Sequence, residues 1–432
     1  MKRGLFPLAM LAVFAGAFFK ASQFPESALF QTPATQTVIS SSARFTSHFA
    51  SSKLFTQVHA ASCVELNDGR IRAFWFSGSR EGAKDVAIHS AVFDPATSLW
   101  SAEQTSVTRE QTQQGLHRYI AKLGNPVVGR AADGSLLMFY VSVSLGGWAG
   151  SSITTRVSHD EGASWGEPRR LVTSPFMNIS TLVKGAPFLY RDGSLGLPVY
   201  HEFLGKFSEI IRLDPQGNVR DKQRITPGGT ETLQPIVFIK DNNNAQVLMR
   251  NGGKHSERRV VAVSTQDAGQ HWSTPELLNL RNPDAALSGV VLPDGRMLVA
   301  LNDTEHGREV LSLSISADSG KSWQQVVELE NQLATGAQPG EARYPANTQA
   351  MLVQSEAAIP ADKVAAYLES TRRTVCNQGP CRYEFSYPYL LQTRRGDFHL
   401  VYTWNRTFIK HLSFNQQWLD QRLQQTTAHE LH

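Results

Sequence analysis

An eight-residue pattern occurs three times in this chain of 432 residues. The stretches are SHDEGASW (158–165), TQDAGQHW (265–272) and SADSGKSW (316–323). Each has Ser or Thr, then Asp two residues on, Gly four on and Trp seven on. An Asp side chain accepts hydrogen bonds from turn amides, Gly adopts positive φ, and Trp supplies a large packing surface. The pattern therefore predicts a structural turn between two outer strands of a repeated β unit.

Six hairpin signals lie between runs of alternating apolar residues, and these predict the inner strands of the same units. They read NDGR, ADGS, RDGS, KDNNN, PDGR and RRGD. The Asp turn follows five of them, intact in three and degenerate at Asp94 and Asp214. Units of about four short strands at this spacing are typical of propeller blades. We therefore expect an all-β, six-bladed β-propeller.

The sixth unit has no Asp turn, as expected if a strand from the other end of the chain completes that blade. We place this strand before Phe55, around TQTVISS (35–41). Helical periodicity is nearly absent, and 360–370 is the one stretch predicted to be a helix. The expected organisation is an N-terminal segment (1–22), a linker with the closing strand (23–52), the propeller (53–415) and a C-terminal tail (416–432).

The N-terminus indicates export. Lys2 and Arg3 precede an apolar run over residues 5–19, which is short for a membrane span and fits a secretory signal. Ala15-Gly16-Ala17 offers a cleavage site, although bulky Phe residues follow it. A cleaved signal and an uncleaved inner-membrane anchor through residues 5–19 both remain open. Either one predicts a periplasmic or secreted protein.

Charge and cysteine content exclude several classes of function. A net charge of +4 without a long basic run argues against nucleic-acid binding. Cys376 and Cys381 bracket CNQGPC, whose Gly and Pro allow a tight turn, so they are candidates for a disulfide. Cys63 is expected to be a buried thiol. Three cysteines without a C-x-x-C motif do not suggest zinc, and we expect no metal or cofactor.

The pattern S/T-x-D-x-G-x-x-W is the Asp box of BNR repeats, and with six predicted blades the chain resembles the sialidase superfamily from about Lys53 to Phe414. Stretches such as KLGNPVV, LPVYHEF, TLQPIVF and YTWNRTFIKH resemble the bacterial predicted-neuraminidase branch. The resemblance implies exo-α-sialidase-like glycoside hydrolysis. In such enzymes three arginines hold a sugar carboxylate, a Tyr activated by a Glu is the nucleophile, and an Asp is the acid/base.

Four stretches match the positions of that machinery. SGSREGAKD implies Arg80 as a site arginine and Asp85 as the acid/base. QVLMR implies Arg250, and HGREVLSLSISADSGKSW implies Arg308, as arginines that bind the carboxylate. FSYPYLL implies Tyr387 as the nucleophile.

Three positions depart from the sialidase pattern. His59, in FTQVHAAS, stands where the first arginine is expected. Gln234 stands where the Glu that activates the Tyr is expected, with Glu231 three residues away. Thr403, in YTWNR, replaces the carboxylate that supports the first arginine. The arginine and its support are thus both replaced, so a substrate with an acidic sugar other than sialic acid is an alternative.

Further candidates follow from the convergence of blades on one axis. Arg406 lies at the end of an inner hairpin strand, like Arg80, Arg250 and Arg308, and guanidinium groups suit a carboxylate ligand. The adjacent His201 and Glu202 could supply acid/base chemistry, with Glu202 in place of the missing base, and His59 is a third candidate.

Trp148, in LGGWAGS, could stack on a sugar ring. The leading hypothesis is an exported sialidase-type hydrolase that acts on an acidic glycan or oligosaccharide. A polysaccharide lyase acting on a uronic-acid glycan through His59 and a Tyr is one alternative. A glycan-binding propeller of the cell envelope without catalysis is the other.

Overall fold

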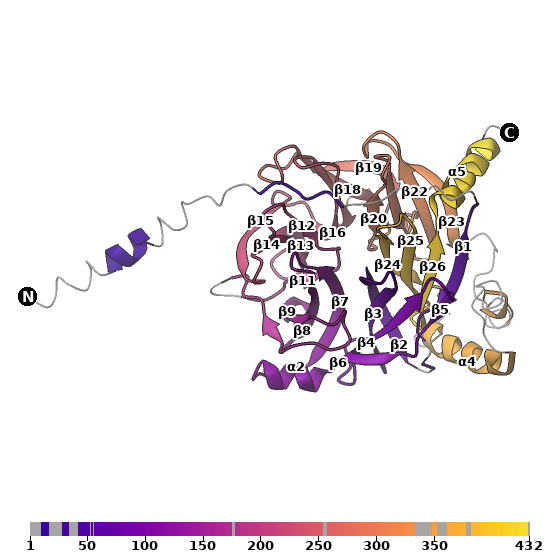
Figure 1. Cartoon of the computed structure of the whole chain (residues 1–432), viewed down its shortest axis with the longest axis horizontal. Coiled ribbons are helices and arrows are strands. Elements are labelled where there is room, and N and C mark those ends of the chain that lie inside the picture. Colours follow the sequence, from indigo (N-terminus) through magenta and orange to yellow (C-terminus); the bar gives the residue numbers. More distant parts are fainter. Residues whose placement is uncertain are drawn as a thin grey trace, which may run out of the picture.

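The computed structural model describes residues 10–16, 28–33, 42–51, 53–54, 56–174, 178–253, 257–332, 346, 348–351, 361–376 and 382–430. These residues form six antiparallel sheets arranged around a common axis (Figure 1). The six-bladed β-propeller predicted from the repeats is therefore confirmed.

The first three blades each begin with the strand nearest the axis. Blade 1 contains β2 (Gln57–Glu65), β3 (Ile71–Gly78), β4 (Ala87–Asp94), β5 (Leu99–Trp100) and β6 (Gln104–Val107). Blade 2 contains β7 (Lys122–Arg130), β8 (Leu136–Val143), β9 (Ser151–Ser158) and β10 (Arg169–Arg170). Blade 3 contains β11 (Leu182–Val183), β12 (Phe188–Leu189), β13 (Leu195–His201), β14 (Phe207–Leu213) and β15 (Val219–Arg224).

The remaining blades follow the same order, except that the last takes its outer strand from the N-terminal region. Blade 4 contains β16 (Thr232–Ile239), β17 (Ala245–Asn251), β18 (Arg259–Thr265) and β19 (Glu276–Arg281). Blade 5 contains β20 (Ser288–Val291), β21 (Met297–Leu301), β22 (Val310–Ser316) and β23 (Gln324–Asn331). Blade 6 contains β24 (Phe385–Gln392), β25 (Phe398–Trp404), β26 (Phe408–Phe414) and β1 (Phe45–Phe49).

The inner strands close a ring. Strand β2 packs against β7, β7 against β11, β16 against β20, β20 against β24, and β24 against β2. Blade 3 contacts blade 4 through β13 and β16. The inner strands β2, β7 and β16 are buried along nearly their whole length, as expected for sheets packed against neighbours on each side. Residues at one end of the inner strands consequently surround a single axial space.

The three repeated turns join the third and fourth strands of blades 2, 4 and 5, as predicted. In the first of them, Asp160 accepts hydrogen bonds from the Ser158 hydroxyl (2.8 Å) and the Ser164 amide (2.9 Å). Gly162 has φ 81° and donates its amide to the Ser158 hydroxyl. The other two turns repeat these contacts around Asp267 and Asp318. We call these three segments the Asp turns.

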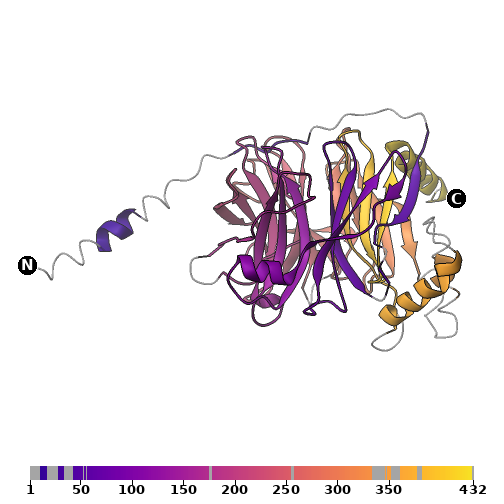
Figure 2. The same cartoon turned by 60° about the horizontal axis from the view of Figure 1, so that its bottom comes forward.

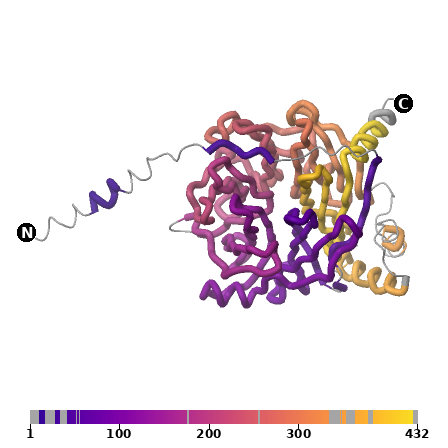
Figure 3. Tube along the Cα trace, viewed as in Figure 1, coloured from indigo at the N-terminus to yellow at the C-terminus, as the bar shows by residue number. Residues whose placement is uncertain are grey.

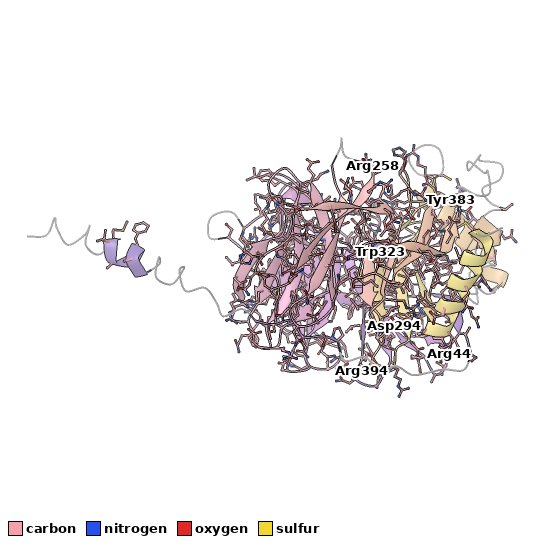
Figure 4. All side chains as sticks on the ribbon, turned by 90° about the horizontal axis from the view of Figure 1, so that it is seen from above. Arg44, Arg258, Asp294, Trp323, Tyr383 and Arg394 are labelled. Atoms are coloured by element: carbon pink, nitrogen blue, oxygen red, sulfur yellow. The ribbon has the colours of Figure 1, made fainter. Side chains whose placement is uncertain are left out.

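The Trp that ends each Asp turn packs against the preceding blade. Trp165 meets Phe74 of blade 1 edge to face, with ring centroids 5.7 Å apart. Trp323 lies 6.1 Å from Phe238 of blade 4 and is 6% exposed. Figure 4 labels Trp323 within the body of the propeller. The repeat thus recurs because each blade must be fixed to its neighbour.

Strand β1 closes the ring by pairing antiparallel with β26, from Phe45 opposite Phe414 to Phe49 opposite Lys410 (Figure 3). A closing strand before Phe55 was predicted, and this part is confirmed. The stretch proposed for it, 35–41, lies outside the described residues, and the strand is formed by FTSHF.

Helices α2 (Arg109–Gly115), α4 (Val364–Val375) and α5 (Gln416–Glu430) flank the blades, with 3-10 turns η1 (Trp148–Gly150) and η2 (Ala361–Lys363). Figure 2 shows α2 and α4 in the lower half of the molecule. The helix predicted over 360–370 corresponds to α4, whereas the sequence analysis missed α2 and α5. Helix α2 is polar and begins with a capping box at Thr108. Its sequence therefore has no helical periodicity of apolar residues.

The N-terminal segment is described only in part. Residues 10–16 form a helical turn, and the rest of the predicted signal or anchor (1–22) lies outside the described residues. Within the described part of the chain, no helix has the length and apolar character needed to span a membrane.

Candidate active site

The inner edge of every blade carries one non-glycine residue in the left-handed conformation. In β2, β7, β16 and β24 this residue sits in a β-bulge, where the pairing register with the next strand shifts. A bulge re-aims side chains that would otherwise face a neighbouring sheet. The six residues, in chain order, are Ala60, Asn125, Ser180, Gln234, Asp284 and Tyr387.

Three of these residues, Asn125, Gln234 and Tyr387, directly precede a proline. Their φ values are 43°, 49° and 55°. A residue before proline normally adopts an extended backbone conformation. A left-handed backbone conformation at a non-glycine residue costs on the order of 1 kcal/mol or more. Strain of this kind persists where the surrounding structure enforces it, and it concentrates at functional sites.

Gln234 connects the predicted nucleophile to the predicted arginine of blade 4. Its Nε2 donates to the Tyr387 hydroxyl at 2.9 Å, and its Oε1 accepts from Arg250 Nη1 at 3.0 Å. Arg250 Nε in turn donates to Asp284 at 2.6 Å. One hydrogen-bonded chain therefore runs from blade 5 through blade 4 to the phenol of blade 6.

Glu384 joins two further arginines beside Tyr387. It accepts hydrogen bonds from Arg406 Nε (2.7 Å), Arg308 Nη1 (3.2 Å) and the Ser386 hydroxyl (2.6 Å). Arg406 also pairs with Glu81 at 2.5 Å. Burial opposes ionisation of Glu384, but Arg406 and the neighbouring cations outweigh it and lower the pKa of this carboxyl.

His59 occupies the place of the missing arginine and contacts the residue that replaces the arginine's support. Its Nδ1 shares a hydrogen bond of 2.9 Å with the Thr403 hydroxyl. Its ring lies 4.2 Å from the Tyr387 ring, centroid to centroid. Burial, reinforced by Arg406, holds the pKa of His59 well below its usual value, so the imidazole is neutral at pH 7.

Lys184, which directly follows β11, lies beneath Tyr387. It is 3% exposed, and its Nζ donates to the Pro388 carbonyl at 3.1 Å. The Nζ lies 5.8 Å from the centre of the Tyr387 ring and 5.1 Å from that of Tyr389. Burial lowers the pKa of Lys184 to about 7.

Glu202 and His201, candidates for acid/base chemistry, lie in different surroundings. Glu202 is half-buried, and burial raises the pKa of its carboxyl, against the opposing effect of Arg250. His201 instead contacts Glu209 at 2.8 Å. Successive residues of an extended strand point to opposite faces, and the acid/base roles expected for His201 and Glu202 stay predictions.

The loop after β3 contributes Glu81, not Asp85, to the contacts around Arg406. Asp85 is exposed and accepts hydrogen bonds from the amide and hydroxyl of Ser79, both at 2.9 Å. Arg80 is also exposed. The described contacts do not join Asp85 or Arg80 to Tyr387, and their assigned roles stay predictions.

Trp148 lies in η1, next to the first residues of β7. A Cβ at Gly124 would meet its ring at 2.7 Å, and Lys122 Nζ lies 5.9 Å from the ring centre. The indole is half-buried, so its role in sugar stacking stays a prediction.

The described residues show no cluster of three His, Cys, Asp or Glu side chains able to hold a metal ion. Cys63 is a buried free thiol, and Cys376 is disulfide-bonded. Cys381, its predicted partner, lies outside the described residues.

The profile of the BNR repeat-like domain matches residues 69–400, most of the propeller. The chain belongs to this family. A comparison of its sequence with curated proteins returns no match.

Several solved structures have a fold similar to that of this chain. A Hadza microbial sialidase is 14% identical with a TM-score of 0.60, over 84% of this chain and 66% of that one. An intramolecular trans-sialidase from Ruminococcus gnavus is 11% identical with a TM-score of 0.58, over 84% and 95%. A protein of unknown function from Dyadobacter fermentans is 11% identical with a TM-score of 0.63, over 89% and 100%. This BNR repeat-like propeller has the fold of sialidases.

The sequence analysis missed several residues of the site. Two of them, Asn125 and Lys184, stand next to sequence features that could have identified them. Asn125, whose Nδ2 donates to the Tyr200 hydroxyl at 3.3 Å, shares with Gln234 and Tyr387 the proline that follows. Lys184 is a charged residue directly after the apolar stretch STLV. No feature of the local sequence identifies Glu384 and Asp284. They contact Arg308 and Arg250 only because the blades close into a ring.

Proposed function

We propose that this protein is an exported glycoside hydrolase of sialidase type that removes an acidic sugar from a glycan. The observation that carries the proposal is the position of Tyr387. Its hydroxyl is held by Gln234, and its ring lies near the cationic groups of Lys184 and Arg308. The sialidases with the same fold support the reaction class.

Three guanidinium groups favour an anionic substrate. The side chains of Arg250, Arg308 and Arg406 are 14%, 23% and 28% exposed, so each is partly open to solvent. A guanidinium has five N–H groups, and the described contacts use two or three on each. The remaining donors suit a carboxylate on the sugar.

The chain of hydrogen bonds through Gln234 prepares Tyr387 for attack. Arg250 polarises the Gln234 amide, whose N–H then favours negative charge on the Tyr387 oxygen. The phenol proton passes to the neutral imidazole of His59 beside it. The Tyr387 oxygen attacks the anomeric carbon, the bond to the leaving oxygen breaks as that oxygen takes the proton of a carboxyl, and a glycosyl–tyrosine intermediate forms. Water then attacks the anomeric carbon and gives a proton to that carboxylate, while the departing Tyr387 oxygen recovers its proton from His59.

A protonated carboxyl is needed to donate a proton to the leaving oxygen. Glu202 meets the electrostatic requirement, because burial raises its pKa. Asp85 is the alternative implied by the family pattern. The variants Glu202→Gln and Asp85→Asn separate the two: loss of the acid abolishes turnover of natural glycosides but spares aryl glycosides whose leaving group needs no proton.

The test of the proposal is a screen of sialylated, uronate-containing and other acidic glycans, with wild-type protein and Tyr387→Phe side by side. Product analysis by mass spectrometry should show a released acidic sugar carrying one added water. The Phe variant should lose this product. Turnover that persists in the Phe variant would remove Tyr387 from the mechanism.

His59 favours a second reaction, elimination from a uronic-acid glycan. A neutral imidazole against a phenol can take the proton next to the uronate carboxylate while the bond to the leaving oxygen breaks. The product sugar then contains a carbon–carbon double bond and lacks the added water. Ultraviolet absorbance from this unsaturated product, lost in His59→Ala, would decide for the lyase.

Export is part of the proposal. It is supported by the basic and apolar pattern of residues 1–22 and by the disulfide at Cys376, since structural disulfides persist in oxidising compartments. Fractionation of expressing cells should find the protein in the periplasm, the medium or the inner membrane. Its recovery in the cytoplasm alone would refute export.

A further inference from the structure

A cavity of about 250 Å³ lies between blades 1 and 2. Its walls come from β3, β4 and β6 of blade 1, from helix α2, and from β9 and the Asp turn of blade 2. None of its lining residues belongs to the cluster around Tyr387. The cavity is thus a separate site on the propeller.

Two arginines line this cavity without an opposing carboxylate. Arg156 is 7% exposed and donates to the Tyr140 hydroxyl (3.4 Å) and the Gly166 carbonyl (3.1 Å). Arg72 is half-buried and makes one long contact, 3.5 Å, to the Ser90 hydroxyl. Neither forms an ion pair with any described residue, and no Asp or Glu lines the cavity.

The nearest acidic groups are occupied elsewhere. Asp160 and Glu161 act on Arg72 electrostatically. Asp160 accepts from Ser164 within its own turn, and Glu161 pairs with Arg130 at 2.8 Å. Burial lowers the pKa of Arg72 despite these acids. The cavity therefore retains uncompensated positive charge.

Two buried donors in the cavity wall also lack acceptors among the described residues. These are Nε of Arg72 and Nε1 of Trp165. A buried unpaired charge or donor costs free energy, and native proteins almost always satisfy such groups. Uncompensated cations with orphaned donors at one cavity indicate that the missing partner is an anionic ligand.

The shape and the remaining lining identify the class of ligand. The cavity is larger than a single inorganic ion requires. Its rim offers the amides of Gln104 and Gln111, the hydroxyls of Thr105 and Ser106, and the indole of Trp165. Amides and hydroxyls bind sugar hydroxyls, and an indole packs against a sugar ring. We propose that this interblade cavity binds one acidic sugar unit, with its carboxylate between Arg72 and Arg156.

Calorimetric titration of the full chain with glucuronic acid, glucose and inorganic sulfate tests the proposal. Arg72→Gln should weaken glucuronate binding at one site at least tenfold, while leaving turnover at the axial site unchanged. Arg70→Gln is the matched control, since Arg70 is an exposed arginine paired with Asp68 outside the cavity. Its binding should equal that of the wild type.

A second variant guards against misfolding of the first. Thr105→Trp closes the rim from an exposed position and should abolish the same site without removing a charge. Sulfate binding as tightly as glucuronate would mean an adventitious ion only and would overturn the sugar assignment. Glucuronate binding that neither variant alters would overturn the site itself. Both results are independent of whether Tyr387 supports turnover.

Discussion

The outer edge and the inner edge of the blades both contain non-glycine residues in the left-handed conformation, but these residues serve different purposes. Each Asp turn places a left-handed residue before its glycine: Glu161, Ala268 and Ser319. Each inner edge also places a left-handed residue at the axis. At the outer edge the surrounding Ser or Thr, Asp, Gly and Trp recur, whereas at the axis the six residues differ. The same residue types recur at the outer edge, where they pack one blade against the next. The residue types differ at the axis, where the six side chains form one site.

The two edges also differ in what they contribute to stability. The Asp turns gain hydrogen bonds and bury a Trp between blades. The axis holds a buried ammonium at Lys184, a buried neutral imidazole at His59 and left-handed residues before proline. Groups that cost stability persist where they serve function. Substitutions at the axis should therefore reduce activity more than stability, and substitutions in the Asp turns should reduce stability more than activity.

The largest expected effect is on turnover at the axis. Tyr387→Phe should lower kcat by about 10³-fold or more, because the nucleophilic oxygen is lost. Stability should change by about 1 kcal/mol, since one hydrogen bond is removed. Steady-state kinetics and urea unfolding measure the two. Tyr389→Phe in the same strand is the control and should keep its kcat.

At the outer edge a substitution should reduce stability and leave activity unchanged. Trp323→Ala should lower the free energy of unfolding by about 3 kcal/mol or more, because a buried indole between blades 4 and 5 is lost. The value of kcat/KM per folded molecule should equal that of the wild type. A folded Trp323→Ala protein with reduced kcat/KM would show that the two edges are coupled.

Lys184→Met should raise stability by about 2 kcal/mol at pH 6 while reducing turnover, because it removes a buried cation beneath Tyr387. The folded pKa of Lys184 is about 7, below that of a free lysine. The wild type therefore carries the full burial penalty below pH 7 and loses it as pH rises through 7 toward the unfolded pKa. Urea unfolding across this range should show the advantage of Met shrinking with pH. A constant advantage would contradict the buried ammonium.

The smallest expected effect concerns one carboxylate of an Asp turn. Asp318→Ala removes the acceptor for the Ser316 hydroxyl and the Ser322 amide, and stability should fall by about 1 kcal/mol. Thermal unfolding detects the loss, and kcat should be unchanged. A large loss of activity with intact folding would assign this turn a role beyond packing.

The same contrast explains what could be predicted from the sequence. The blades, hairpins and Asp turns are set by local residues, so the repeated pattern was sufficient to predict them. The contacts of Gln234 with Tyr387 and of His59 with Thr403 join positions that the sialidase resemblance had already singled out. Local patterns do not specify which loop residue reaches the axis.

Glu81 and Asp85 illustrate this limit. Both lie in one short loop, and only its folded path directs Glu81 to Arg406 and Asp85 to Ser79. Lys184 was missed for a different reason. A lysine in a sequence is normally exposed, and its burial here follows from three blades meeting around it.

The central claim is that the axial cluster hydrolyses a bond to an acidic sugar through Tyr387. Mass spectrometry of an acidic glycan incubated in ¹⁸O-labelled water, with wild-type protein and Tyr387→Phe, tests it most directly. The account predicts that wild-type protein releases an acidic sugar carrying one labelled oxygen, and that the Phe variant releases none. An unlabelled unsaturated product, or equal release by both proteins, would contradict it.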